Sequence, residues 1–122
     1  FLASLAKTLL VNHQHSPISS QSGIYHAVPH GYTSWHGLAQ FVIGLIQDMK
    51  MPTRVTLGNV LPIPATEYPL PAPRPYNSRL CNKKLANYLA VINAENPSPL
   101  QLQHWQKDVV AYVHQYAELI KQ

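Results

Sequence analysis

Charged residues are scarce in this chain. Only 11% of its 122 residues are Asp, Glu, Lys or Arg, against about 25% in average soluble domains. A catalytic triad or a pair of catalytic carboxylates needs acids close to the reacting groups, but Glu67 is the only acid in the polar middle of the chain. The low charge therefore argues against these hydrolytic sites and predicts that one face of the chain is covered by another domain.

Cysteine, glycine motifs and long apolar runs are also missing. Cys81 is the only cysteine, which excludes an intrachain disulfide and a thiolate metal cluster and fits a reducing cytoplasm. The five glycines never form the G-x-G-x-x-G turn of a dinucleotide site, and no tyrosine is followed four residues later by a lysine, the spacing of a catalytic phenol–lysine pair on a helix. Without a run of about 18 apolar residues or a basic leader, we expect no membrane segment.

Positive charge is concentrated in the middle of the chain. Residues 50–84 contain six Lys or Arg residues and one Glu, a net charge of +5, whereas the remaining residues carry −1. Such a region suits a phosphorylated small ligand or nucleic acid. Because the chain has no arginine-rich run and no alternation of basic and aromatic residues, we expect no nucleic-acid partner. A solvated basic edge remains the simpler alternative.

The spacing of apolar residues predicts four helices and two short strands. Thr33 or Ser34 is suited to cap the second helix, and its many apolar residues predict burial on more than one side. Trp35 and Trp105 lie on apolar stripes, which predicts core packing for both. The predicted helices span 1–11, 33–49, 82–92 and 100–120, the strands span 23–28 and 54–63, and a surface loop spans 13–23.

Seven histidines raise the question of a metal site. His104 and His114 share the last predicted helix, but ten residues separate them by about 15 Å, too far to bind one ion. The other histidines are scattered over predicted loops and element ends. We therefore expect no metal site.

Residues 62–80 form a proline-rich segment. Prolines at 62, 64, 69, 71, 73 and 75 exclude a helix or a central strand. Its far end carries guanidinium, amide and hydroxyl groups that can hydrogen-bond an anion or a sugar. We predict an ordered loop that presents these groups to a substrate, or, alternatively, a loop in which Arg74 and Asn77 only bind the carbonyls of the loop itself. The candidate substrate-binding residues are Arg74, Asn77, Ser78 and Arg79.

Three blocks of the sequence carry a family resemblance. They read GIYHAVPHGYTSWHGLAQFV, TEYPLPAPRPYNSRL and NKKLANYL, the last followed by the helix of Trp105. In this order they resemble the dTDP-4-dehydrorhamnose reductases, a family of extended short-chain dehydrogenases/reductases. The resemblance extends from about residue 2 to residue 117, and the proline-rich loop is its most specific part. The positions that match the loop and helix-start motifs, none of them catalytic in the family, are Thr33, Ser34, Trp35, Arg74, Pro75, Asn77, Ser78 and Leu80.

The resemblance implies an α/β fold of the extended SDR, Rossmann-like type. This chain, residues 1–122, would be its C-terminal substrate-binding domain, mostly α-helical with two or three short strands. The chain starts with Phe1 inside a helical pattern, so we expect it to be a piece of a longer protein. The N-terminal Rossmann domain, with the catalytic Tyr and Lys, would lie upstream, and the piece alone would be inactive and bind no cofactor.

The intact protein would use NAD(P)H to reduce dTDP-4-dehydro-L-rhamnose to dTDP-L-rhamnose in the cytoplasm, as a step of dTDP-rhamnose biosynthesis. Its partners would be the dTDP-sugar and its own N-terminal domain, and a homodimer stays open. The alternative is a non-catalytic regulatory member of the same fold family, such as the β subunit of methionine adenosyltransferase.

This chain departs from the family pattern at three places. Cys81 stands where an Asp or Asn usually caps the following helix, a loss worth about 1 kcal/mol. We expect Asn82 to take over the cap one residue later. Pro73 replaces a polar or small residue, and residues 91–100 form a longer connection than usual.

Overall fold

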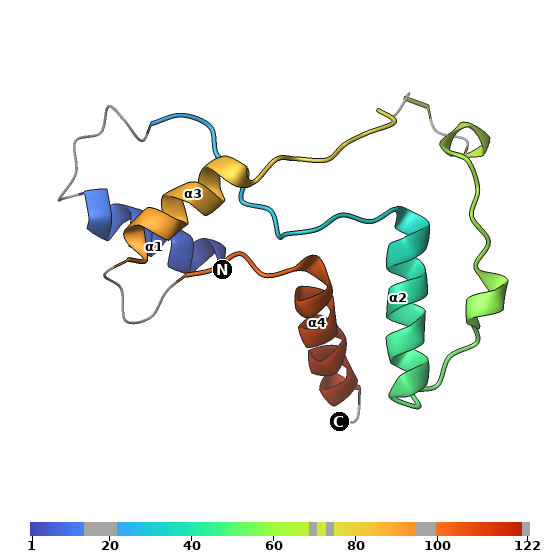
Figure 1. Ribbon diagram of the computed structural model, residues 1–122. Coiled ribbons are helices and arrows are strands. Elements are labelled where there is room, and N and C mark those ends of the chain that lie inside the picture. The colour runs from blue at the N-terminus through green and yellow to red at the C-terminus, as the bar shows by residue number, and fades with distance from the viewer. Residues whose placement is uncertain (14–21, 69–70, 73–74, 95–99, 121–122) are drawn as a thin grey trace. The chain divides into compact units, whose positions relative to one another are not determined.

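A computed structural model describes residues 1–13, 22–68, 71–72, 75–94 and 100–120 of the chain. The described residues form helices and 3-10 turns joined by extended segments (Figure 1). Two compact units are present, and each is considered by itself: the first contains Phe1–His30 and Leu80–Gln103, the second Gly31–Arg79 and His104–Gln122. In chain order the elements are α1 (Leu2–His13), α2 (Trp35–Asp48), η2 (Leu57–Asn59), η3 (Ala65–Glu67), α3 (Lys83–Ile92) and α4 (Trp105–Leu119).

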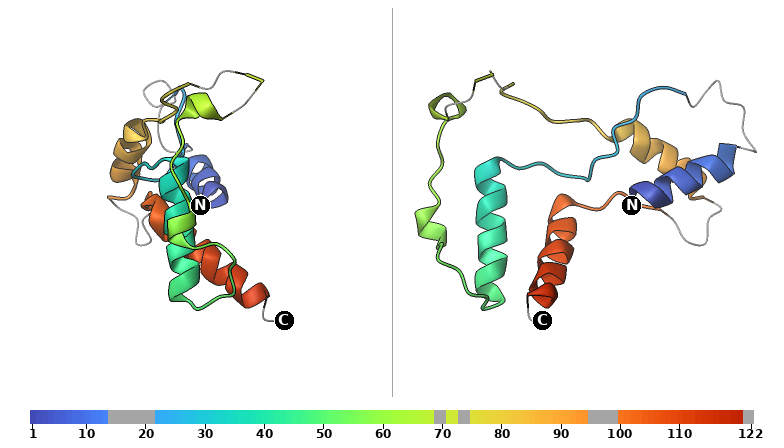
Figure 2. Two further views of the ribbon diagram at one scale, coloured as in Figure 1. Left: turned by 90° about the vertical axis from the view of Figure 1, so that its right-hand side faces the viewer. Right: turned by 180° about the vertical axis from the view of Figure 1, so that it is seen from behind.

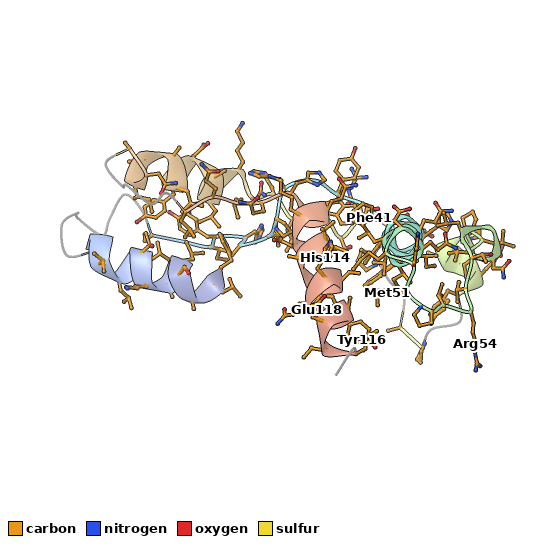
Figure 3. All side chains as sticks on the ribbon, turned by 90° about the horizontal axis from the view of Figure 1, so that it is seen from below. Phe41, Met51, Arg54, His114, Tyr116 and Glu118 are labelled. Atoms are coloured by element: carbon orange, nitrogen blue, oxygen red, sulfur yellow. The ribbon has the colours of Figure 1, made fainter. Side chains whose placement is uncertain are left out.

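The first unit is built around a small leucine core. Leu5 of α1 and Leu85 and Leu89 of α3 are 6%, 1% and 3% exposed, and Leu85 and Leu89 share one helix face because they are four residues apart. Figure 3 shows extended segments of the chain between α1 and α3. Both predicted helices are thus confirmed. Half-buried residues of the extended segments and of the end of α3 pack against the core, namely Tyr25, Ala27, Ile92, Leu100 and Leu102.

The predicted strand at 23–28 does not form in the described structure, where these residues are extended but unpaired in any ladder. The backbone N–H of His30 donates to the carbonyl of Gln103 over 2.8 Å, but this pairing is too short to make a ladder. The carbonyls of Val28 and Pro29 instead accept hydrogen bonds from the side-chain amide of Asn82, over 3.0 and 3.2 Å. Side-chain donors thus satisfy backbone groups that a neighbouring strand would otherwise satisfy.

The second unit pairs α2 with α4, which lie side by side and run in the same general direction (Figures 1 and 2). Phe41 of α2 meets Trp105 of α4 edge to face, with ring centroids 5.1 Å apart, a favourable arrangement for aromatic rings. Val113 and Ala117 are buried on α4. In contrast, α2 has no fully buried residue, but every residue from His36 to Ile46 is half-buried, so the helix is partly covered on more than one side and fully buried on none.

Trp35 also differs from its prediction. Its side chain is 79% exposed at the first position of α2. It therefore does not pack in a core. Trp105 is half-buried, in line with its predicted packing role. The prediction of core packing is therefore confirmed for Trp105 and wrong for Trp35.

The end of α2 is fixed by a left-handed residue. Lys50 has φ +54°, its N–H donates to the carbonyl of Gln47, and the N–H of Met51 donates to that of Ile46. This pair of bonds is the Schellman arrangement, in which the left-handed position favours glycine. The helix therefore stops before Pro52 is reached.

The predicted strand at 54–63 is replaced by turns. Thr53 Oγ1 accepts from the N–H of Val55 over 3.1 Å, and η2 begins two residues later. The His36 ring Nε2 lies 3.0 Å from the carbonyl oxygen of Val60. Local side-chain bonds of this kind compete with ladder bonds, and prolines at 52 and 62 restrict both ends of the segment.

The last helix starts at Trp105 instead of residue 100. Asn93 holds the preceding segment extended, since its Nδ2 donates to the carbonyl of Leu100 over 2.7 Å and its Oδ1 accepts from the Leu100 N–H over 3.0 Å. Leu102 then packs against the core of the first unit. The predicted helix therefore began about one turn too early.

Candidate functional site

The end of the proline-rich loop meets the segment that leads into α2. The Arg79 guanidinium carbon lies over the Tyr32 ring, 3.7 Å from its centroid, well within the roughly 6 Å range of a cation–π contact. Tyr32 is 68% exposed, and Arg79 is also exposed. The contact joins two sequence blocks that are 47 residues apart, and it forms on an open surface of the second unit.

Asn77 binds the backbone of Arg79. Its Oδ1 accepts a hydrogen bond from the Arg79 N–H over 3.1 Å, the pattern of an Asx turn. The expectation that Asn77 binds its own loop is therefore correct, although the partner is an amide and not a carbonyl. Ser78 lies between the two residues and is exposed. Arg74 lies outside the described residues.

The start of α2 follows Tyr32 by three residues in the chain. Ser34 has extended backbone angles, φ −85° and ψ 167°, and its Oγ accepts from the Gly37 N–H over 3.0 Å. Ser34, and not Thr33, is thus the N-cap that the sequence left open. A helix N-terminus carries a partial positive charge, so the end of α2 adds to the positive field of Arg79.

Lys84, one of the six cations of residues 50–84, is held in the first unit. Its Nζ donates to the carbonyl of Ser22 over 3.1 Å and lies 4.3 Å from the centroid of the Tyr25 ring. Tyr25 in turn packs edge to face on Tyr88, with centroids 5.9 Å apart. Lys84 therefore fastens the extended segment to α3. Lys83 is exposed.

Asn82 does not cap α3, so that prediction is wrong. It occupies the N-cap position but makes no side-chain cap bond, because its amide donates to Val28 and Pro29 and lies 3.3 Å from the His30 ring Nδ1. His26 Nδ1 is 3.3 Å from the carbonyl of the exposed, free Cys81. These histidines have structural neighbours, and among the residues described no group of three His, Cys, Asp or Glu side chains is arranged to hold a metal ion.

Comparison with known families places both sequence blocks in one family domain. Residues 1–118 match the family model described as the RmlD substrate binding domain. The chain belongs to this family. The match covers both units, both sides of the Arg79–Tyr32 contact and the whole proline-rich loop.

Curated relatives of this RmlD-type domain carry one name. A dTDP-4-dehydrorhamnose reductase of Burkholderia thailandensis is 39% identical over 64 residues, which are 52% of this chain and 22% of that protein. The Escherichia coli dTDP-4-dehydrorhamnose reductase is 37% identical over 71 residues, 58% of this chain and 23% of that protein. The chain thus spans less than a quarter of the length of these relatives. The resemblance to their family is confirmed.

Two further findings concern this RmlD-type domain. No solved structure matches the chain. Within the described part of the chain, no helix is long and apolar enough to cross a membrane.

Tyr32 is the site residue that sequence reasoning missed. It precedes the Thr-Ser-Trp motif directly, where a tyrosine in a loop gives no periodic or capping signal. Its role becomes visible only when Arg79 is placed over its ring. Arg79 contacts Tyr32, and Asn77 binds the backbone of Arg79. Ser78 takes part in neither contact.

Proposed function

We propose that this chain is the substrate-binding portion of an NAD(P)H-dependent reductase that converts dTDP-4-dehydro-L-rhamnose to dTDP-L-rhamnose. The main support is the family match over residues 1–118. Relatives that share 37–39% identity with the chain are named dTDP-4-dehydrorhamnose reductases. In this proposal residues 1–122 act as one substrate-binding domain, and the cofactor and the catalytic Tyr and Lys belong to an N-terminal Rossmann domain.

The exposed polar groups at the loop end supply the proposed substrate contacts. Arg79 offers five N–H donors in a planar fork that suits phosphate oxygens. Asn77 retains its side-chain N–H groups as donors, since its Oδ1 is the atom bound to the Arg79 amide. Ser78 offers a hydroxyl for a sugar or phosphate oxygen, and we assign Arg74 to the same substrate as the fourth member of the set.

The reduction itself would need groups that this chain does not supply. A nicotinamide cofactor held by the N-terminal domain would supply the hydride for the 4-keto carbon, and an acid of that domain would supply the proton for the oxygen. The chain has no glycine-rich dinucleotide turn and no Tyr-x-x-x-Lys pair. Its part in the reaction is to bind and orient the sugar nucleotide, which lowers the barrier by placing the keto carbon at the cofactor.

The decisive experiment uses the full-length polypeptide that contains residues 1–122. NADPH and NADH oxidation is followed by absorbance with dTDP-4-dehydro-L-rhamnose, and the product is identified by mass spectrometry. The matched control is the same protein with the upstream catalytic tyrosine changed to phenylalanine. We expect turnover that depends on the sugar nucleotide and is lost in the control, and no turnover from residues 1–122 alone.

Absence of turnover in a protein that retains the upstream Tyr-x-x-x-Lys would refute the enzymatic proposal. If the upstream pair is itself missing and the protein binds a partner enzyme, the regulatory alternative replaces it. The two outcomes are distinguished by the upstream sequence and by activity in the presence of that partner.

A further inference from the structure

Arg79 is held from two sides at an exposed position. Its backbone N–H is bound by Asn77 Oδ1 over 3.1 Å, and its guanidinium lies over the ring of Tyr32 at 3.7 Å. An exposed arginine without such contacts loses rotamer entropy when it binds a ligand. Here part of this entropy is already lost in the folded chain, so the guanidinium is pre-organised.

The contact with Tyr32 leaves the binding edge of Arg79 available. At 3.7 Å over the ring the guanidinium uses its flat face, whereas its N–H donors lie in its plane. A stacked arginine can therefore still form the two parallel bonds by which it recognises phosphate. Tyr32, which is 68% exposed, acts as a support beneath this fork.

The charges of α2 favour an anion near its N-terminus. Tyr32 lies two residues before the Ser34 cap, so the contact forms on the segment that leads into the positive N-terminal end of α2. Asp48, the acid of that helix, stands at its opposite end, about 20 Å away at 1.5 Å per residue.

We propose that Tyr32 is a positioning residue that holds Arg79 for the diphosphate of a nucleoside diphosphate-sugar. The proposal rests on the proposed function and adds a residue outside the loop to its binding site. A nicotinamide dinucleotide carries a diphosphate too. We assign the contact to the sugar nucleotide because this chain lacks the glycine-rich turn that binds a dinucleotide.

The test measures binding separately from turnover. The full-length protein is titrated calorimetrically with dTDP, with thymidine and with NADPH, and KM and kcat are measured for the sugar nucleotide. The variants are Arg79→Ala, Tyr32→Leu, Tyr32→Phe and the double variant Arg79→Ala/Tyr32→Leu. Arg54→Ala serves as the charge-matched control, since Arg54 is also exposed in the second unit and points away from α2 and α4 in Figure 3.

We expect Arg79→Ala to weaken dTDP binding by about 10- to 100-fold, the usual range for a lost charge-assisted hydrogen bond. Thymidine and NADPH binding should stay unchanged, and KM should rise more than kcat falls. Tyr32→Leu should weaken dTDP binding by about 2- to 10-fold, in line with the loss of a cation–π support, whereas Tyr32→Phe keeps the ring and should preserve affinity to within about twofold.

The double variant separates positioning from direct binding. If Tyr32 acts through Arg79, Tyr32→Leu adds no further loss once Arg79 is alanine. Additive losses, an unchanged dTDP affinity in Arg79→Ala, or a loss confined to NADPH would each overturn the proposal. A wild-type protein that fails to bind dTDP would overturn it as well, whereas one that binds dTDP without turnover would contradict only the enzymatic function. Circular dichroism and Tm of each variant identify a loss caused by misfolding, and the selective loss of dTDP binding in Arg79→Ala then remains the test of the site.

Discussion

Asn82 donates its side-chain amide to the carbonyl of Val28 over 3.0 Å, although it stands where a residue would normally cap α3. The same amide reaches Pro29 over 3.2 Å. One side chain therefore connects the start of α3 to an extended segment 54 residues earlier in the chain. In this domain the long-range connection takes the place of the local cap.

This relationship predicts a clear stability difference. Asn82→Ala should lower the free energy of unfolding by about 1–2 kcal/mol, because the half-buried Val28 carbonyl loses its donor. Asn87→Ala is the matched control: Asn87 is exposed on α3, and alanine has the higher helix propensity. Urea unfolding followed by circular dichroism measures both. Equal effects of the two substitutions would contradict the assigned role of Asn82.

Lys50 offers a site where a substitution should stabilise the protein. Its φ of +54° places an L-residue in the left-handed region at the end of α2, where the Cβ atom makes this conformation unfavourable. Lys50→Gly should raise the free energy of unfolding by about 0.5–1 kcal/mol after the greater entropy of the unfolded glycine chain is included.

Lys50→Ala is the control for this prediction, since it removes the same charged side chain but keeps the Cβ. Thermal unfolding should give a higher Tm for the glycine variant than for the alanine variant. A gain in the alanine variant as large as that in the glycine variant would show that the lysine charge, and not the backbone angle, limits stability.

The helices could be predicted from sequence because their signals are local. Leu85 and Leu89 fall four residues apart and are buried together, and Ser34 has the side chain and position of an N-cap. A helix forms its backbone hydrogen bonds between residues four apart, so its sequence pattern can be recognised without knowledge of the rest of the fold.

The strands and the tyrosine of the site could not be predicted in this way. Residues 23–28 have strand-like composition, but their hydrogen-bond partner is the distant side chain of Asn82. Residues 54–63 form turns because Thr53 binds the backbone two residues later. The pairing of Tyr32 with Arg79 likewise depends on two segments meeting in space, which no spacing rule in one sequence reveals.

Two glycines should respond to alanine with opposite signs. Gly31 has φ +82°, and a Cβ there would collide with the His104 ring, so Gly31→Ala should cost about 2–4 kcal/mol through backbone strain and overpacking. Gly44 lies within α2, and a Cβ there would meet nothing within 4 Å, so Gly44→Ala should stabilise the protein by about 1 kcal/mol. Urea unfolding of the two variants gives the signs directly. The variant Gly31→Ala/His104→Ala removes the collision but keeps the strained angle, and it is compared with His104→Ala alone because the His104 side chain also caps α4. Gly31→Ala should cost less in that background, and an equal cost would assign the whole effect to the backbone.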